Sequence, residues 1–422
     1  MKFLKSLSLQ VLIALTAGLV VGAVAAASGG PGAAGVIESI ESLGGLWLNA
    51  LRMTVVPLIF AVLVTGIAQV ADAAATGRLA VRAVIWFGVL LLISALFSVA
   101  WCNGLLALWP VDETAAAALR AGAGAASEAP PAPDFAAWVR GLAPSNPLKA
   151  ASEDQILPLV VFAVFTGFAI TRLQQAAAQS LVAVFQALGD AMIVIVRWVL
   201  MAAPVGVFCL ALGVGLRTGA GAAGIIGQYM VVAASAGAMI TLLGYVMAVT
   251  VARVPFGRWA RATAPVLATA FATQSSLACL PAMIERARDE LDVPEPVANL
   301  ILPLAVAIFR MTSPAVNLAV CIFIAHVYGI QPSPAQYTSG ILVALAMGVG
   351  SIGLPGQVSF IISVAPICAA LNLPIELLPI LLAVEVVPDI FRTLGNVTND
   401  MAVTSVLARG EEKRAAAASS QA

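Results

Sequence analysis

Long runs of apolar residues follow one another along almost the whole chain, separated by short polar stretches. An uncharged run of about 18 residues or more can cross the roughly 30 Å hydrocarbon core of a bilayer as a helix. The pattern therefore predicts an all-α polytopic membrane protein with eight transmembrane helices. The predicted spans are residues 9–28, 45–70, 82–109, 155–172, 185–215, 224–252, 296–328 and 377–408.

Two further apolar segments, residues 257–291 and 333–371, are interrupted in the middle by TQSSLACLP and by GVGSIGLPGQ. Such interruptions free backbone groups that lipid cannot satisfy, so they occur where protein or a watery cavity receives those groups. We therefore predict two re-entrant helical hairpins, each entering and leaving the membrane on one side. Paired interrupted segments indicate the binding site of a transporter.

Composition and charge agree with a membrane protein. The chain has 422 residues, of which 61% are hydrophobic and 10% are charged, whereas about 25% of residues are charged in soluble domains. Because the formal net charge is zero, nothing favours a nucleic-acid partner.

The basic residues favour one side of the predicted spans, which the positive-inside rule assigns to the cytoplasm. We expect a multi-pass protein among the lipids of the inner (plasma) membrane, with both termini in the cytoplasm. The first hairpin then enters from the cytoplasm and the second from outside. Residues 111–145 are interpreted as a flexible extracellular loop, and residues 410–422 as a disordered tail.

One predicted span carries a stripe of polar side chains. At 100° per residue, its five members lie within an arc of about 80°. Charged side chains at mid-membrane are costly, so they face a bundle interior or cavity and are functional candidates. The alternative is an Asp389–Arg392 pair at i,i+3 that only holds helices together. The stripe consists of Glu385, Asp389, Arg392, Asn396 and Asp400.

A second charge, Arg310, lies in the seventh predicted span, with Asn317 on the same helix face and Pro314 between them. Proline cannot donate a hydrogen bond to the carbonyl of Arg310, so we expect a broken helix with free carbonyls there. An ordinary proline kink is the alternative. At the first hairpin tip, Ser275 and Ser276 offer hydroxyl and N–H donors to a carboxylate.

At this point the chain resembles the glutamate transporter family, the dicarboxylate/amino acid:cation symporters. The resemblance covers nearly the whole chain and is strongest in TQSSLACLPAM, GLPGQ and DIFRTLGNVTND. It implies a homotrimer in which fixed scaffold helices support a transport domain that slides across the membrane, an elevator mechanism. The implied parts are scaffold helices 1–2 (1–76), transport helix 3 (77–110), scaffold helices 4–5 (146–222) and the rest of the transport domain (223–409).

The resemblance also implies residue roles. Asp389 would bind the α-amino group of a substrate and Arg392 a side-chain carboxylate, which suits an acidic amino acid such as glutamate or aspartate. The implied substrate-binding set is Ser275, Ser276, Met311, Pro314, Leu354, Pro355, Gly356, Val358, Asp389, Arg392, Thr393 and Asn396.

The cation-binding motif departs from the family. Relatives carry Asn-Met-Asp-Gly-Thr where this chain has Arg310 to Pro314, so the sodium site that would involve Thr312 should be absent. We expect Arg310 to replace sodium by pairing with Asp400, and coupling to pass to protons at Glu385 or Asp389, or to be lost in favour of exchange. The predicted coupling set is Arg310, Thr312, Glu385, Asn396 and Asp400. A sodium site made by the backbone of Ile308, Gly348, Val349 and Ser351 stays open.

Other functions stay open in different degrees. A sodium-coupled C4-dicarboxylate symporter, a cystine or neutral amino acid symporter, and a non-transporting sensor are compatible with the same residues. A channel fits two gated hairpins less well than alternating access does. The chain has no HExxH motif and a single histidine, so we expect no enzyme and no cofactor beyond coupling ions.

Overall fold

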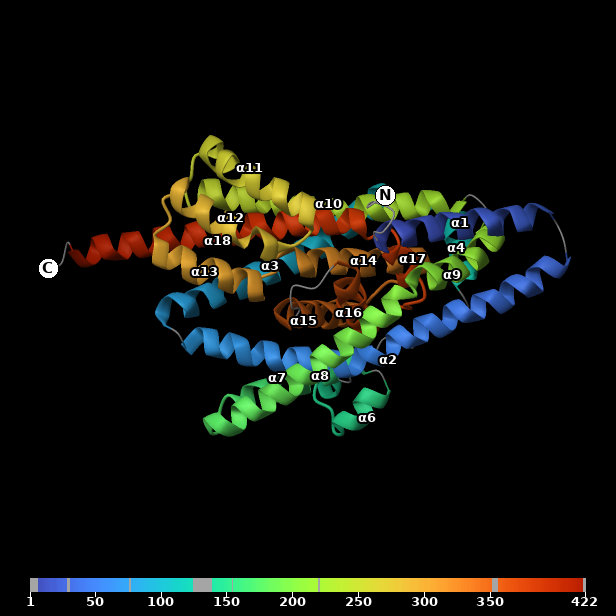
Figure 1. Ribbon diagram of the computed structural model, residues 1–422, viewed down its shortest axis with the longest axis horizontal. Helices are drawn as coiled ribbons and strands as arrows, with labels where there is room; N and C mark the ends of the chain where they lie inside the picture. The colour runs from blue at the N-terminus through green and yellow to red at the C-terminus, as the bar shows by residue number, and fades with distance from the viewer. Residues whose placement is uncertain are drawn as a thin grey trace.

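The computed structural model describes residues 7–28, 31–75, 77–123, 139–153, 155–218, 221–350 and 356–419. This part of the chain consists of helices and connections, without a strand (Figure 1). Its helices long and apolar enough to cross a membrane lie within Gln10–Ala27, Gly35–Ala71, Arg78–Leu108, Gln175–Met201, Gly224–Thr250 and Glu295–Tyr328. Shorter apolar helices cover Ile156–Ile170 and Ala203–Arg217. The all-helical prediction is therefore confirmed for the described residues, and several of these helices suit a multi-pass membrane protein, whereas the number of eight spans stays a prediction.

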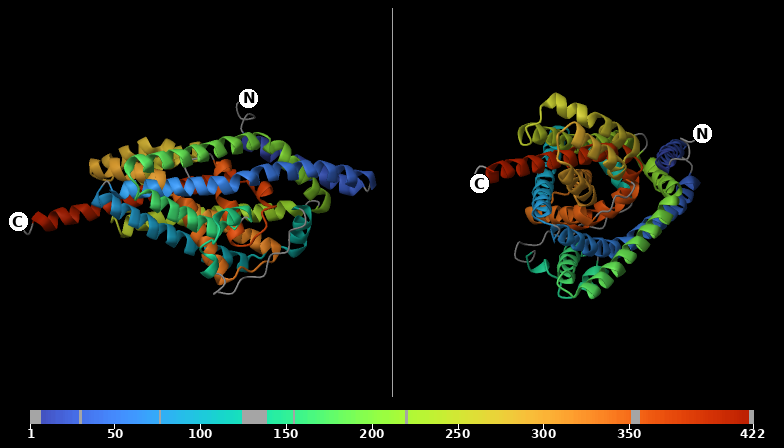
Figure 2. Two further views of the ribbon diagram at one scale, coloured as in Figure 1. Left: turned by 90° about the horizontal axis from the view of Figure 1, so that it is seen from below. Right: turned by 60° about the vertical axis from the view of Figure 1, so that its left-hand side comes forward.

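The helices fall into two packing groups. In the first, α1 packs mainly on α9, and α2 packs on α7, α8 and α9 along one side of the bundle (Figure 2, right). The approach of α1 to α9 is close, since a Cβ on Gly22 would lie 2.2 Å from the carbonyl oxygen of Leu212. The group comprises α1 (Leu7–Ser28), α2 (Pro31–Ala75), α7 (Ile156–Ile170), α8 (Gln175–Met201) and α9 (Ala203–Thr218).

The second group is built around α14 and α18, which are buried by α3, α10 and the two hairpins. Both interrupted segments form helix pairs, as predicted, with α11 packed on α12 and α15 packed on α16. The group comprises α3 (Arg78–Leu108), α10 (Gly221–Thr250), α11 (Phe256–Thr273), α12 (Ser276–Asp289), α13 (Glu295–Ile308), α14 (Thr312–Tyr328), α15 (Pro334–Gly350), α16 (Gly356–Ala370), α17 (Leu378–Leu382) and α18 (Val386–Ser419).

Contacts between the groups centre on α2, which touches α3, α15 and α16. Arg52 of α2 forms an ion pair with Glu376, which follows α16, at 2.8 Å between Nη2 and Oε1. This pair joins the two groups directly.

The fifth and eighth predicted spans are each divided. The fifth starts earlier than expected, at Gln175, and is broken at Ala202 between α8 and α9. Pro204 explains this break because it lacks the N–H that a continuous helix would use. The eighth is interrupted at residues 383–385, between α17 and α18.

Two predicted irregular segments contain helix. The tail continues α18 to Ser419, because EEKRAAAA is rich in the strongest helix formers. The loop contains α4 (Glu113–Ala123), and a short helix, α6 (Pro147–Ser152), follows it. The Asp112 carboxylate accepts the N–H of Ala115 at 2.8 Å, which lowers the pKa of Asp112. Residues 124–138 of the predicted loop and residues 420–422 lie outside the described part of the chain.

Candidate functional site

The seventh span is broken where the sequence predicted a break. Helix α13 ends at Ile308 and α14 begins at Thr312, which places Pro314 in the first turn of α14. Proline is tolerated there because first-turn N–H groups have no partner within the helix. The carbonyls are less free than expected, since Arg310 O accepts from Ser313 N–H at 2.9 Å and Met311 O accepts from the hydroxyl of Ser94 at 2.5 Å.

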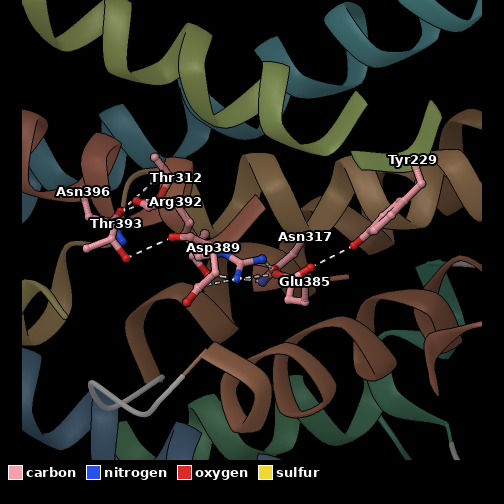
Figure 3. A network of polar contacts seen from close by, with 9 residues as sticks. Tyr229, Thr312, Asn317, Glu385, Asp389, Arg392, Thr393 and Asn396 are labelled. Carbon is pink, nitrogen blue, oxygen red and sulfur yellow. Dashed lines mark hydrogen bonds and ion pairs between the residues drawn. The ribbon is translucent and has the colours of Figure 1, made fainter. Parts of the chain in front are cut away.

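The polar stripe faces inward, as its spacing predicted. Its members are between 0% and 6% exposed; Glu385 directly precedes α18, and Asp389 lies in the first turn of that helix. The positive end of the helix dipole favours carboxylates at that position. The stripe therefore forms a buried polar centre, and Figure 3 shows four of its members, Glu385, Asp389, Arg392 and Asn396.

Arg392 is the hub of this centre. Its Nη1 lies 2.7 Å from Glu385 Oε1 and 3.0 Å from Asp389 Oδ1, and its Nη2 donates to Asn317 Oδ1 at 3.2 Å. The Tyr229 hydroxyl donates to Glu385 Oε2 at 2.9 Å. Two carboxylates thus surround one guanidinium, and the Asp389–Arg392 pair considered as an alternative is part of the network. Figure 3 shows these side chains converging from α10, α14 and α18.

Tyr229 was missed by sequence reasoning. It is fully buried in an apolar helix, α10, and a tyrosine in such a helix normally needs a hydrogen-bond partner. The need of a buried tyrosine hydroxyl for a hydrogen-bond partner could have indicated Tyr229 as a site residue, but it does not identify Glu385 as the partner.

Thr312 and Asn396 join α14 to α18. Asn396 Oδ1 accepts the N–H of Thr312 at 3.0 Å, so this amide caps the start of α14. The Thr312 hydroxyl lies 2.6 Å from the same oxygen and 2.8 Å from the carbonyl of Arg392. Thr393 donates to the carbonyl of Asp389 at 3.0 Å. A Cβ on Gly395 would lie 2.3 Å from Thr312 Cγ2, so only glycine permits this approach.

The expected pairing of Arg310 with Asp400 is not formed. Both carboxylate oxygens of Asp400 are buried without a hydrogen-bond partner, and so is Nε of Arg310. Arg310 is partly exposed whereas Asp400 is 0% exposed. Arg310 lies in a partly exposed position and the Asp400 carboxylate in the fully buried part of α18, so the two charges do not meet.

The hairpin tips are described to different extents. In the first, Gln274 has a positive φ of 50°, and Ser275 caps α12 by accepting the N–H of Ala278 at 3.3 Å. Ser276 is the first residue of α12 and is buried. In the second, Gly348 lies near the end of α15, where an added Cβ would be 3.6 Å from Pro314 Cγ.

Several predicted residues lie outside what the structure describes. Gly356 begins α16 and Val349 belongs to α15, but the side chain of Val349 is not described. At the second tip, the side chain of Val358 is not described either. Three predicted positions there lie outside the described residues: Ser351, Leu354 and Pro355.

The loss of a sodium site at the altered motif stays a prediction. Across the described ranges, no group of three or more His, Cys, Asp or Glu side chains could hold a metal ion. At the altered motif, the Thr312 hydroxyl and Asn396 Oδ1 already bond to each other. The backbone site at Ile308 and Gly348 stays a prediction.

Residues 7–410 match the family model described as the sodium:dicarboxylate symporter family. The chain belongs to this family. It is 26% identical to the proton/glutamate-aspartate symporter of Escherichia coli, over 97% of this chain and 93% of that protein.

Two further relatives differ in the substrate that their names give. The human neutral amino acid transporter B(0) is 28% identical, over 94% of this chain and 79% of that protein. The C4-dicarboxylate transport protein 1 of Pseudomonas aeruginosa is 25% identical, over 97% of this chain and 90% of that protein. The chain is thus a secondary transporter of the membrane. The members of its family are transporters, which is consistent with the expectation that this protein is not an enzyme.

Proposed function

We propose that this protein carries an acidic amino acid, such as glutamate or aspartate, across the inner membrane by an elevator mechanism. The observation that carries the proposal is the buried Asp389–Arg392 pair, one turn apart, beside a broken helix and two hairpins. A carboxylate and a forked guanidinium at this spacing can hold a zwitterion that carries a second carboxylate.

Substrate binding requires an exchange of partners. Asp389 would turn from Arg392 to the substrate ammonium group, and the substrate's side-chain carboxylate would take the place of Glu385 on Arg392. The Glu385 contact of 2.7 Å is the shorter of the two ion pairs. Glu385 is therefore the internal competitor of an acidic substrate.

This competition suggests a route for coupling to protons. When Glu385 binds a proton, its attraction for Arg392 falls, and the guanidinium becomes free for a substrate carboxylate. The groups facing Glu385 are Tyr229 of α10 and Arg392 and Asp389 of α18. Arg310 would supply positive charge near Asp400 in place of a sodium ion, and obligate exchange is the alternative form of coupling.

The two packing groups support the elevator part of the proposal. The first group matches the scaffold expected from the family, and the second contains both hairpins and the polar centre. We propose that the second group moves as one body and that three copies assemble through the first group.

A thermal-shift screen of the purified protein tests the proposal. Aspartate, glutamate, alanine, serine and succinate would be added with and without sodium, at pH 6 and pH 8. We expect stabilisation by the acidic amino acids, greater at pH 6 and independent of sodium. Stabilisation by none of these compounds, or reconstituted uptake driven by a sodium gradient with pH clamped, would contradict it.

A neutral amino acid is the second candidate substrate, and one observation favours it. Because Glu385 already neutralises Arg392, a ligand without a second carboxylate could bind Asp389 alone. Alanine or serine would then stabilise the protein more than aspartate does, at both pH values.

A further inference from the structure

A second polar cavity lies at the far end of α18, about 20 residues beyond Asp389. It has a volume of about 380 Å³ and opens between three segments: the α10–α11 connection, the α12–α13 connection and α18. At 1.5 Å per residue, α18 separates it from the substrate centre by roughly 30 Å. It is thus independent of the polar centre described above.

The two connections that line this cavity have the same backbone form. After α10, Val254 N–H donates to Ala248 O at 3.0 Å, and after α12, Val293 N–H donates to Ala287 O at 3.0 Å. Each bond closes a helix-ending turn, and the residue before the N–H donor is left-handed. Each turn is followed by a proline that is the N-cap of the next helix. The left-handed residues are Arg253, with φ of 55°, and Asp292, with φ of 54°.

An arginine is an unusual choice for this position. Glycine is preferred there because it pays no Cβ penalty, which is roughly 1–2 kcal/mol for other residues. Non-glycine residues in the left-handed region cluster at functional sites. Arg253 is exposed and lines the cavity, and none of the described residues forms a hydrogen bond or ion pair with its side chain.

The cavity carries an excess of positive charge. Arg253, Arg258 and Arg409 line it, against a single carboxylate, Asp292. Arg258 is bound to that carboxylate at 2.5 Å and also donates to Glu290 O. Arg409 donates one of its guanidinium N–H groups to Ala252 O at 2.8 Å, which orients it at the cavity wall. One acid cannot neutralise three guanidinium groups.

We propose that this cavity binds a phosphate-bearing anion, such as the headgroup of an anionic phospholipid. Guanidinium groups recognise phosphate through paired N–H donors. Basic pockets between transmembrane helices on the cytoplasmic side bind such headgroups, and the charge bias assigns this end to the cytoplasm. A bound anion would tie both ends of the first hairpin to α18.

Binding is tested on the full-length protein with two probes. Inorganic phosphate is titrated in detergent and thermal stability is measured. Nanodiscs that contain either phosphatidylglycerol or only phosphatidylcholine supply the lipid probe, and retained lipid is counted by native mass spectrometry. A response to phosphatidylglycerol indicates the headgroup as the source of the anion, and a response to phosphate alone indicates a free anion. No response to either probe overturns the proposal.

Variants of Arg253 separate a ligand role from a structural one. Arg253→Gly removes the guanidinium and relieves the left-handed backbone, so the unliganded protein should become more stable while its response to the anion weakens about tenfold. Arg253→Gln should weaken the response similarly. Arg261→Gln, at an exposed arginine of α11 outside the cavity, should leave it unchanged. If the Arg253 and Arg261 variants respond equally to the anion, the proposal is overturned. Amino acid binding should be unchanged in all three variants.

Discussion

Replacing Glu385 with glutamine tests how the polar centre works. In the described structure, its carboxylate lies 2.7 Å from Arg392 and accepts a hydrogen bond from Tyr229. Glutamine has the same size and keeps an oxygen acceptor for the tyrosine. Asp389 still neutralises Arg392 at 3.0 Å, so we expect Glu385→Gln to fold.

The expected effect on an acidic substrate follows from the lost competition. Close charge pairs have coupling energies of about 1.5–7 kcal/mol, and about 1.4 kcal/mol corresponds to a factor of ten. Because the glutamine amide retains a weaker contact with Arg392, the lower end of this range applies. Aspartate should therefore bind about tenfold more tightly at pH 8, with little further gain at pH 6.

Isothermal titration with aspartate and alanine at both pH values measures this effect. Glu295→Gln, which removes a carboxylate from a surface pair with Arg288, is the matched control and should behave as the natural protein does. The competition argument is refuted if Glu385→Gln binds aspartate no more tightly than the natural protein does. It is also refuted if the pH dependence of binding is retained. Tighter binding of alanine alone would favour the neutral substrate.

Three further predictions concern neighbouring contacts. Gly395→Ala places a Cβ 2.3 Å from Thr312 Cγ2. We expect this overpacking to lower the free energy of unfolding by about 1–3 kcal/mol and to weaken substrate binding, as measured by thermal unfolding and by titration. Gly227→Ala is the control and should be neutral, because there is open space around Gly227. If the two packing groups move relative to each other as proposed, Arg52→Glu or Glu376→Arg alone should change the ratio of the two conformations by up to about fivefold, measured by single-molecule fluorescence. The double variant should restore the original ratio. The double variant with Arg310→Asn and Thr312→Asp restores two residues of the family motif. We expect sodium to stabilise this variant and not the natural protein. Stabilisation of both proteins would show that the altered motif still permits sodium binding.

The sequence predicted the architecture because membrane burial imposes strong patterns. Long apolar runs, the two interruptions and the break near Pro314 each follow from the need to satisfy backbone groups in lipid, and each corresponds to an element of the structure. The break at Ala202 was missed because Pro204 lies within an otherwise continuous apolar run. The helical tail was missed because its alanine-rich sequence is typical of disorder as well as of helix.

The contacts within the site were harder to predict than its members. Helical periodicity shows that the stripe residues share one face, but it does not show that Arg392 contacts both Glu385 and Asp389. Tyr229 and Asn317 complete this network, and they come from other helices. The same limit explains Arg310, whose pairing with Asp400 was expected from the family's cation-binding motif. The charge of a residue identifies it as a candidate, while its partner is determined by the packing of distant segments. The side chains that bind and release Arg392 are therefore the ones whose substitution is most informative about transport.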